Sequence, residues 1–135
     1  MSEVVKNRPR YGVMRLIDAT GYRLPLAGFV SILHRASGAL MFLLLPFILY
    51  LLDLSITSEL SFANLKSFTS GPFVKLVIVA VVWAYLHHFC AGIRHLFMDV
   101  HMGLDKESGR KTAVAVLAIS LTLAALVALK LFGVF

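Results

Sequence analysis

Three runs of apolar residues, each long enough to cross a lipid bilayer, constrain this chain more than any other feature of its sequence. They cover about residues 24–52, 72–99 and 112–134, and a membrane-spanning helix needs about 20 mostly apolar residues. Apolar residues make up 59% of the 135, and the mean hydropathy of +0.86 is too high for a soluble fold of this size. The sequence therefore predicts an all-α integral membrane protein, with three transmembrane helices in a single domain (residues 1–135).

The distribution of basic residues predicts how these helices are oriented. Residues 1–23 are rich in Lys and Arg and are expected to form a cytoplasmic or interfacial arm, while Lys106, Arg110 and Lys111 lie in the second loop. Cytoplasmic loops carry an excess of Lys and Arg, so we expect a cytoplasmic N-terminus and an external C-terminus. We therefore interpret the net charge of +6 as an orientation signal in a lipid membrane and expect no nucleic-acid partner.

We expect no cleaved signal peptide at the first residues. Residues 1–10 lack an apolar core followed by a small-residue cleavage site, and Glu3 and Asp18 are not typical of a transit peptide. The absence of a visible presequence favours a bacterial cytoplasmic membrane over the mitochondrial inner membrane. The single cysteine, Cys90, permits no disulfide within the chain and is interpreted as a packing residue.

Ionisable and small residues share one face of each of the first two runs. Ser31, His34, Arg35 and Gly38 are spaced i, i+3, i+4 and i+7 in the first run. In the second run, His88, Gly92, His95 and Asp99 also fall on one helical face. An ionisable group inside a membrane-length helix is costly, so by default it marks a functional site or a polar partner.

The two polar clusters are expected at the same depth. Arg35 lies about 26 Å from the outer end of the first run, and His88 lies about 24 Å from the same side, at 1.5 Å per residue. Because the runs are antiparallel, both clusters should meet in the cytoplasmic half of the membrane.

Imidazoles and cations at that depth are typical of a haem site. His88 or His87 is a candidate ligand of the haem iron, and His34 and Arg35 are candidate partners of its propionates. His95 lies about 10 Å along the helix from His88, too far to bind the same iron from one helix.

Quinone reduction is a second chemistry that fits these residues, because a quinone needs a hydrogen-bond donor at each carbonyl and a route for protons. Ser31 and Arg35 are candidate donors, and Asp99 is a candidate for passing protons at the boundary.

Structural roles compete with these assignments. For His87, a structural hydrogen bond to a neighbouring helix is the favoured role. For His95 and His101, at the membrane boundary, a solvated or headgroup role is favoured over ligation. Arg94 fits headgroup anchoring as well as a cofactor role, and Ser31 fits packing or a bond to its own helix backbone.

Two motifs carry a resemblance to a known family. The first is Ser31-Ile32-Leu33-His34-Arg35-Ala36-Ser37-Gly38, preceded by Arg8-Pro9 and Arg23-Leu24-Pro25. The second is His88 followed by Gly92-Ile93-Arg94-His95 and then Asp99. In these residues the chain resembles the cytochrome b membrane-anchor subunit of succinate dehydrogenase, respiratory complex II. The resemblance covers nearly the whole chain, although residues 10–21 do not follow the family pattern.

The resemblance implies a role for each candidate residue. It implies that His88 is the haem b axial ligand on this chain, with the second ligand supplied by a second membrane-anchor subunit. It implies that Ser31 and Arg35 line the ubiquinone site, and that His34 and Arg35 lie near the haem propionates. His95 is kept as a further cofactor-binding candidate.

The same resemblance implies the assembly. The chain is expected to complete a helical bundle with the second membrane anchor, to meet an iron–sulfur subunit, and to leave succinate oxidation to a flavoprotein subunit. It would then be a non-flavin subunit of a succinate:ubiquinone oxidoreductase. The alternatives are an anchor of a quinol:fumarate reductase, a small proton or anion transporter subunit, or an anchor without haem.

Overall fold

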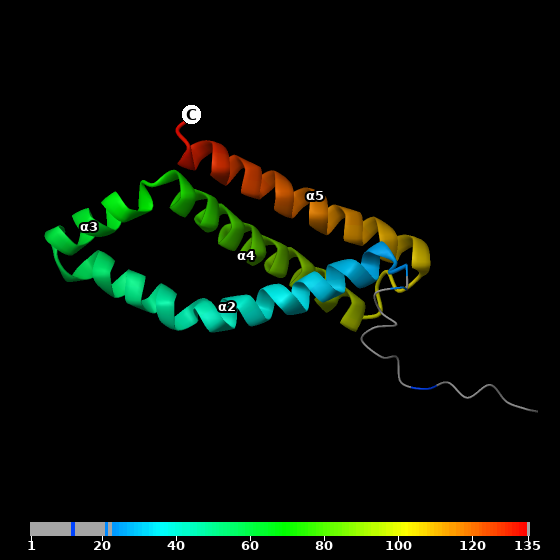
Figure 1. Ribbon diagram of the computed structural model, residues 1–135. Coiled ribbons are helices and arrows are strands. Elements are labelled where there is room, and N and C mark those ends of the chain that lie inside the picture. The colour runs from blue at the N-terminus through cyan, green and yellow to red at the C-terminus, as the bar shows by residue number, and fades with distance from the viewer. Residues whose placement is uncertain (1–11, 13–20, 22, 135) are drawn as a thin grey trace, which may run out of the picture.

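Three long helices and one short helix make up the part of the chain that the structure describes. The computed structural model describes Gly12, Gly21 and residues 23–134, so the expected arm lies almost entirely outside the described residues. The helices are α2 (Leu26–Thr57), α3 (Glu59–Thr69), α4 (Pro72–Asp99) and α5 (Lys106–Leu131) (Figure 1). Three of them, α2, α4 and α5, are long and apolar enough to cross a membrane. The predicted all-α fold with three spans is confirmed.

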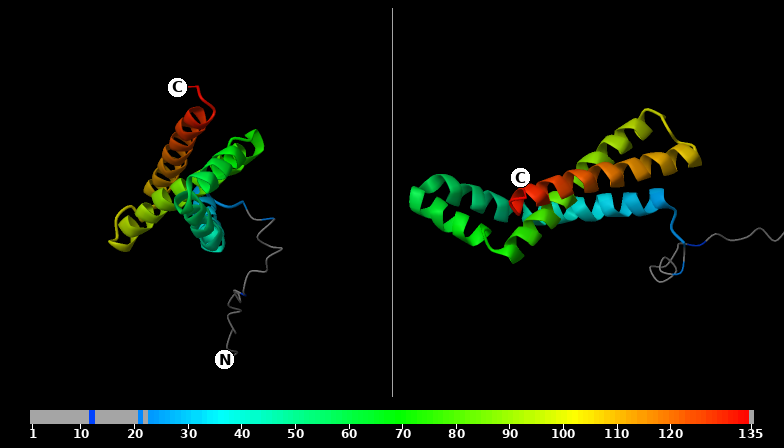
Figure 2. Two further views of the ribbon diagram at one scale, coloured as in Figure 1. Left: turned by 90° about the vertical axis from the view of Figure 1, so that its left-hand side faces the viewer. Right: turned by 90° about the horizontal axis from the view of Figure 1, so that it is seen from above.

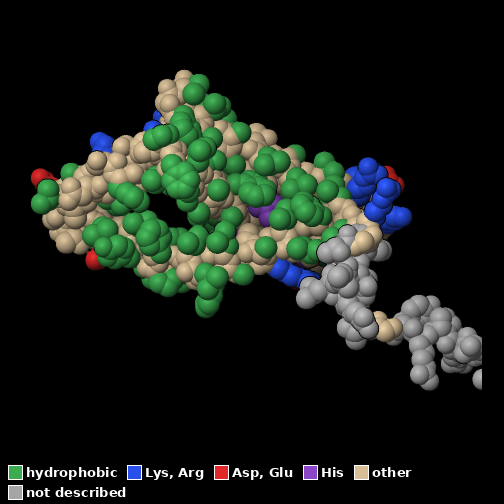
Figure 3. Space-filling model, viewed as in Figure 1, with side chains coloured by type: hydrophobic (Ala, Val, Ile, Leu, Met, Phe, Trp, Pro, Cys, Tyr) green, Lys and Arg blue, Asp and Glu red, His purple; other side chains and the backbone are tan. Residues whose placement is uncertain are grey.

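The long helices run in alternating directions. The start of α2 and the connection from α4 to α5 lie at one end of the molecule, while α3 closes the other end (Figure 1). Seen from above, α4 is inclined to both α2 and α5 (Figure 2). Figure 3 shows Lys and Arg side chains gathered at the end where α4 connects to α5, the end predicted to be cytoplasmic.

The segment between the first two predicted spans, residues 53–71, is mostly helical. α2 continues to Thr57, and α3 begins directly after Ser58. The Ser58 side chain accepts from the Ser61 backbone N–H, and the Ser61 side chain accepts from the Ser58 backbone N–H, both at 3.1 Å. This capping box starts a new helix without an intervening loop. Pro46 lies inside α2, as expected for a helix that bends (Figure 1).

The connection between α4 and α5 is shorter than the expected second loop. α5 begins at Lys106 rather than near residue 112, because the Asp105 carboxylate accepts from the Ser108 backbone N–H at 2.9 Å and caps the helix. This hydrogen bond lowers the pKa of Asp105. α4 ends in a Schellman motif, in which Met102 N–H donates to Phe97 and His101 N–H to Met98, both at 3.0 Å. The motif places His101 at a φ of 62°, where glycine is usual.

Small residues line the surfaces on which the spans pack. The buried residues are Val30 and Ser37 of α2, Ala84, His87, Ala91 and Arg94 of α4, and Ala113, Val116, Ser120 and Ala124 of α5. Small side chains let membrane helices approach closely, and packing then replaces the hydrophobic driving force that lipid removes. Most large apolar side chains point outward, as expected for a surface covered by lipid or by further helices.

Candidate functional site: a histidine cluster between two spans

Three histidines from α2 and α4 meet between these helices. The rings of His34 and His88 are stacked, with centroids 4.2 Å apart and an angle of 17° between their planes. The centroid of the His95 ring lies 4.9 Å from the centroid of the His34 ring. The two polar clusters therefore lie at one depth, as the count of residues along each span predicts.

Glycine makes this close approach possible. A Cβ atom at Gly38 would lie 2.8 Å from Cε1 and 3.3 Å from Nδ1 of His88, closer than carbon atoms pack in proteins. On the opposite helix, a Cβ atom at Gly92 would lie 3.7 Å from Nε2 of His34, an ordinary contact. His88 can therefore lie against α2 only because residue 38 has no side chain.

Hydrogen bonds orient the His88 ring. Its Nδ1 lies 3.0 Å from the backbone carbonyl oxygen of His34 and 3.3 Å from the Ser37 hydroxyl. Ser37 itself donates to the His34 carbonyl at 2.9 Å. A carbonyl oxygen only accepts, so this geometry is satisfied by the tautomer that carries its hydrogen on Nδ1. Nε2 then keeps a free lone pair, the arrangement typical of a metal-ligating histidine.

His87 occupies a different environment. Its side chain is 1% exposed, and neither ring nitrogen has a hydrogen-bond partner among the described residues. The centroids of the Trp83 and His87 rings are 5.7 Å apart. Because its own chain encloses it, a cofactor bound outside this chain would reach His88 more easily.

The remaining candidates lie on α2 and α4 next to the cluster. Ser31 is half-buried and Arg35 is exposed on α2, and neither side chain has a hydrogen-bond partner in residues 23–134. Asp99 is exposed at the last residue of α4.

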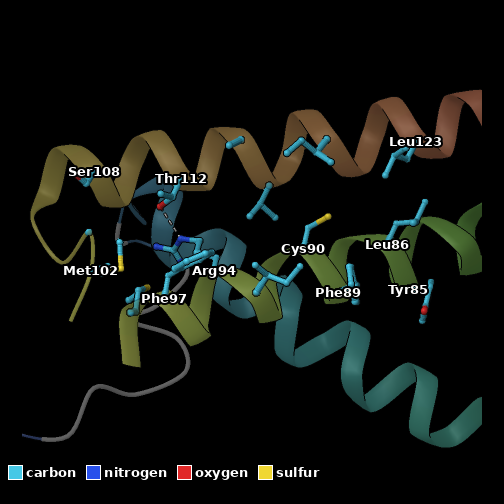
Figure 4. A pocket seen from close by; sticks show the side chains of 16 residues that line it. Tyr85, Leu86, Phe89, Cys90, Arg94, Phe97, Met102, Ser108, Thr112 and Leu123 are labelled. Carbon is cyan, nitrogen blue, oxygen red and sulfur yellow. Dashed lines mark hydrogen bonds between the residues drawn. The ribbon is translucent and has the colours of Figure 1, made fainter. Parts of the chain in front are cut away.

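Arg94 has a structural contact that sequence reasoning missed. Its side chain is 7% exposed, and its Nε donates to the Thr112 hydroxyl at 3.0 Å, linking α4 to α5 (Figure 4). Its Nη2 lies 3.5 Å from the Gly109 carbonyl oxygen. Thr112, at the start of the third span, was the sequence signal for this contact. The sequences of α4 and α5 do not show how the two helices are aligned, so the pairing with Arg94 could not be predicted.

The described residues contain no group of three or more His, Cys, Asp or Glu side chains that could hold a metal ion. The site fits a metal that takes one ligand from this chain and its other ligands elsewhere. His88 has the geometry for such a single ligand.

Comparisons with known proteins give a consistent family assignment. Residues 7–127 match the family model of the succinate dehydrogenase/fumarate reductase transmembrane subunit. The chain is similar to the succinate dehydrogenase cytochrome b556 subunit of Coxiella burnetii, with 35% identity over 77% of this chain and 84% of that protein. It is also similar to the proteins of that name from Paracoccus denitrificans (33%, covering 82% and 85%) and Rickettsia felis (32%, covering 76% and 79%).

Proposed function

Because this chain belongs to the succinate dehydrogenase/fumarate reductase transmembrane subunit family, we propose that it is the membrane-anchoring cytochrome b subunit of a succinate dehydrogenase. In this role it helps to bind haem b and ubiquinone, and electrons pass from an iron–sulfur subunit to the quinone. Succinate is oxidised on a separate flavoprotein subunit. The relatives named above are cytochrome b556 subunits, which supports the haem assignment.

His88 is the residue of this chain that ligates the haem iron. The observation that carries this assignment is the oriented imidazole: Nδ1 faces the His34 carbonyl oxygen at 3.0 Å, and Gly38 makes room for the ring. The bonded nitrogen holds the ring in place and raises the basicity of the other. When bound, haem b supplies reversible one-electron transfer. The second membrane anchor of the complex would supply the other ligand of the haem iron.

Further polar side chains lie in or next to the histidine cluster. His34 stacks on the His88 ring and also contacts His95, while Arg35 follows His34 directly in α2. Haem propionates are anionic and are stabilised by charge-assisted hydrogen bonds from such groups. We assign His34 and Arg35 to the propionates, with His95 as a further contact.

Ser31 and Arg35 form the part of the ubiquinone site that this chain contributes. They lie one helical turn apart on α2, and their donors have no partners within residues 23–134. A hydroxyl and a guanidinium can each donate to a quinone carbonyl, and an arginine in a membrane-length helix requires a polar partner. Asp99, exposed at the cytoplasmic end of α4, passes protons toward the quinone as it is reduced.

The assembly includes the second membrane anchor, the iron–sulfur subunit and the flavoprotein subunit, in a bacterial cytoplasmic membrane. The many outward-facing apolar side chains of α2 and α4 provide the surface on which the helices of the second anchor complete the bundle. The same anchor in a quinol:fumarate reductase would run the reaction in reverse.

Purification in a mild detergent tests this function. We expect flavoprotein, iron–sulfur and second anchor subunits to co-purify, with a dithionite-reduced spectrum that contains a b-type haem band and with succinate:ubiquinone reductase activity. A preparation with no reducible haem band and no partner subunits would favour the transporter alternative and refute the proposal.

A further inference from the structure

A long groove between α4 and α5 lies outside the histidine cluster. Its volume is about 800 Å³, and it reaches from Arg94, Ser108 and Thr112 at the cytoplasmic end to Tyr85 and Leu123 deeper in the membrane (Figure 4). Between these ends its walls are apolar, with Phe89, Cys90 and Ile119 among them. The groove thus combines a polar end with a hydrocarbon-like body.

Among the residues that the structure describes, no acidic side chain pairs with the positive charge at the polar end of the groove. Arg94 is buried, and its two hydrogen bonds within residues 23–134 go to the Thr112 hydroxyl and the Gly109 carbonyl, which are both neutral. The salt bridge found in the same part of the chain joins Lys111 to Glu107 at 2.7 Å and does not involve Arg94. A buried guanidinium is stabilised when an anion pairs with it, because burial removes the water that would otherwise solvate its charge.

The dimensions of the groove match one leaflet of a bilayer. From Arg94 to Tyr85 the α4 wall is about 14 Å long, and from Thr112 to Leu123 the α5 wall is about 16 Å long, at 1.5 Å per residue. Half of a hydrocarbon core of about 30 Å is about 15 Å. Arg94 therefore lies at the depth of the headgroups when the apolar part of the groove spans the cytoplasmic leaflet.

From these observations we propose that the α4–α5 groove binds an anionic phospholipid of the cytoplasmic leaflet. Arg94 pairs with the phosphate, the hydroxyls of Ser108 and Thr112 lie beside it, and one acyl chain follows the apolar walls past Ile119. Exposed Lys106, Arg110 and Lys111 near the start of α5 raise the local concentration of anionic lipid. A wholly apolar helix of a partner subunit fits less well, because it would leave the Arg94 charge without an anion.

A groove-filling substitution tests this proposal in the intact complex. Ala115 lines the groove, and Ala118 is exposed on the same helix but does not line it. We expect lipid mass spectrometry of the purified complex to find phosphatidylglycerol or cardiolipin bound to wild type and to Ala118→Trp, and only background amounts bound to Ala115→Trp. Equal lipid retention by the two tryptophan variants would overturn the proposal.

Two further experiments test separately whether the Arg94 charge binds the phosphate and whether a lipid occupies the groove. Arg94→Gln should reduce the preference for phosphatidylglycerol over phosphatidylcholine by about fivefold, the factor equivalent to about 1 kcal/mol per basic residue near the surface, whereas Arg94→Lys should keep it. An unchanged preference in Arg94→Gln refutes the phosphate contact. A photo-crosslinking residue at position 119 should gain the mass of a phospholipid, and an adduct with a partner polypeptide would overturn the lipid assignment. None of these readouts depends on quinone reduction.

Discussion

Replacing Gly38 by alanine perturbs the histidine cluster by a single methyl group. The added Cβ would lie 2.8 Å from Cε1 of His88, whereas carbon atoms in proteins pack at about 3.5–4.0 Å. The ring must therefore retreat by about 0.7 Å or more, or the two helices must separate. Either movement lengthens the 3.0 Å contact between Nδ1 and the His34 carbonyl oxygen.

The expected cost has two parts. Overpacking a well-filled interface costs about 1–3 kcal/mol, and the loss of one net hydrogen bond costs about 1 kcal/mol. Alanine has a higher helix propensity than glycine, and this difference offsets about 1 kcal/mol of the destabilisation. We expect Gly38→Ala to destabilise the complex by about 1–3 kcal/mol and to change the haem spectrum, since the ligand itself moves.

The assay compares Gly38→Ala with Gly28→Ala on the same helix. A Cβ at Gly28 would lie 3.6 Å from the nearest atom, in the Pro25 ring, which is an ordinary contact. Thermal unfolding and the reduced haem spectrum should therefore be unchanged or improved in Gly28→Ala and impaired in Gly38→Ala. If both variants behave like wild type, Gly38 does not set the position of His88.

The remaining predictions concern the quinone site, a strained residue and a helix cap. Arg35→Leu and Ser31→Ala should lower ubiquinone reduction while the complex still assembles, because each removes a donor to the quinone; normal reductase activity in both would contradict their assignment. His101→Gly should raise thermal stability by about 1 kcal/mol, because glycine adopts a positive φ without the cost that other residues bear; a lower melting temperature would count against this. The lowered pKa of Asp105 means that its contribution is present above about pH 4 and is lost as the pH falls through the folded-state pKa. Over that pH range, Asp105→Asn should therefore lose less folding stability than wild type as the pH falls. If the stabilities of the two proteins fall in parallel, the protonation of Asp105 is not linked to folding.

The spans and the shared depth of the polar clusters were predictable because both depend on simple lengths. A run of about 20 apolar residues needs a helix in lipid, and a fixed rise per residue places His34 and His88 at one level in antiparallel helices. The stacking of these rings does not follow from that count, because it also depends on how each helix is rotated and on the absence of a side chain at Gly38.

Other features depend on contacts that a one-dimensional pattern does not contain. α3 and the early start of α5 rely on single side-chain caps at Ser58 and Asp105, which are weak signals within polar segments. The Arg94–Thr112 bond depends on the rotation of α5 about its own axis. The different surroundings of His87 and His88 became evident only when the packing of α2 against α4 was known.

The most direct test of the central claim compares His88→Leu with His87→Leu in the purified complex by reduced-minus-oxidised absorption spectroscopy. If His88 supplies the iron ligand on this chain, His88→Leu loses or shifts the low-spin haem band, while His87→Leu retains it. A normal band in His88→Leu, or its loss only in His87→Leu, would contradict the account.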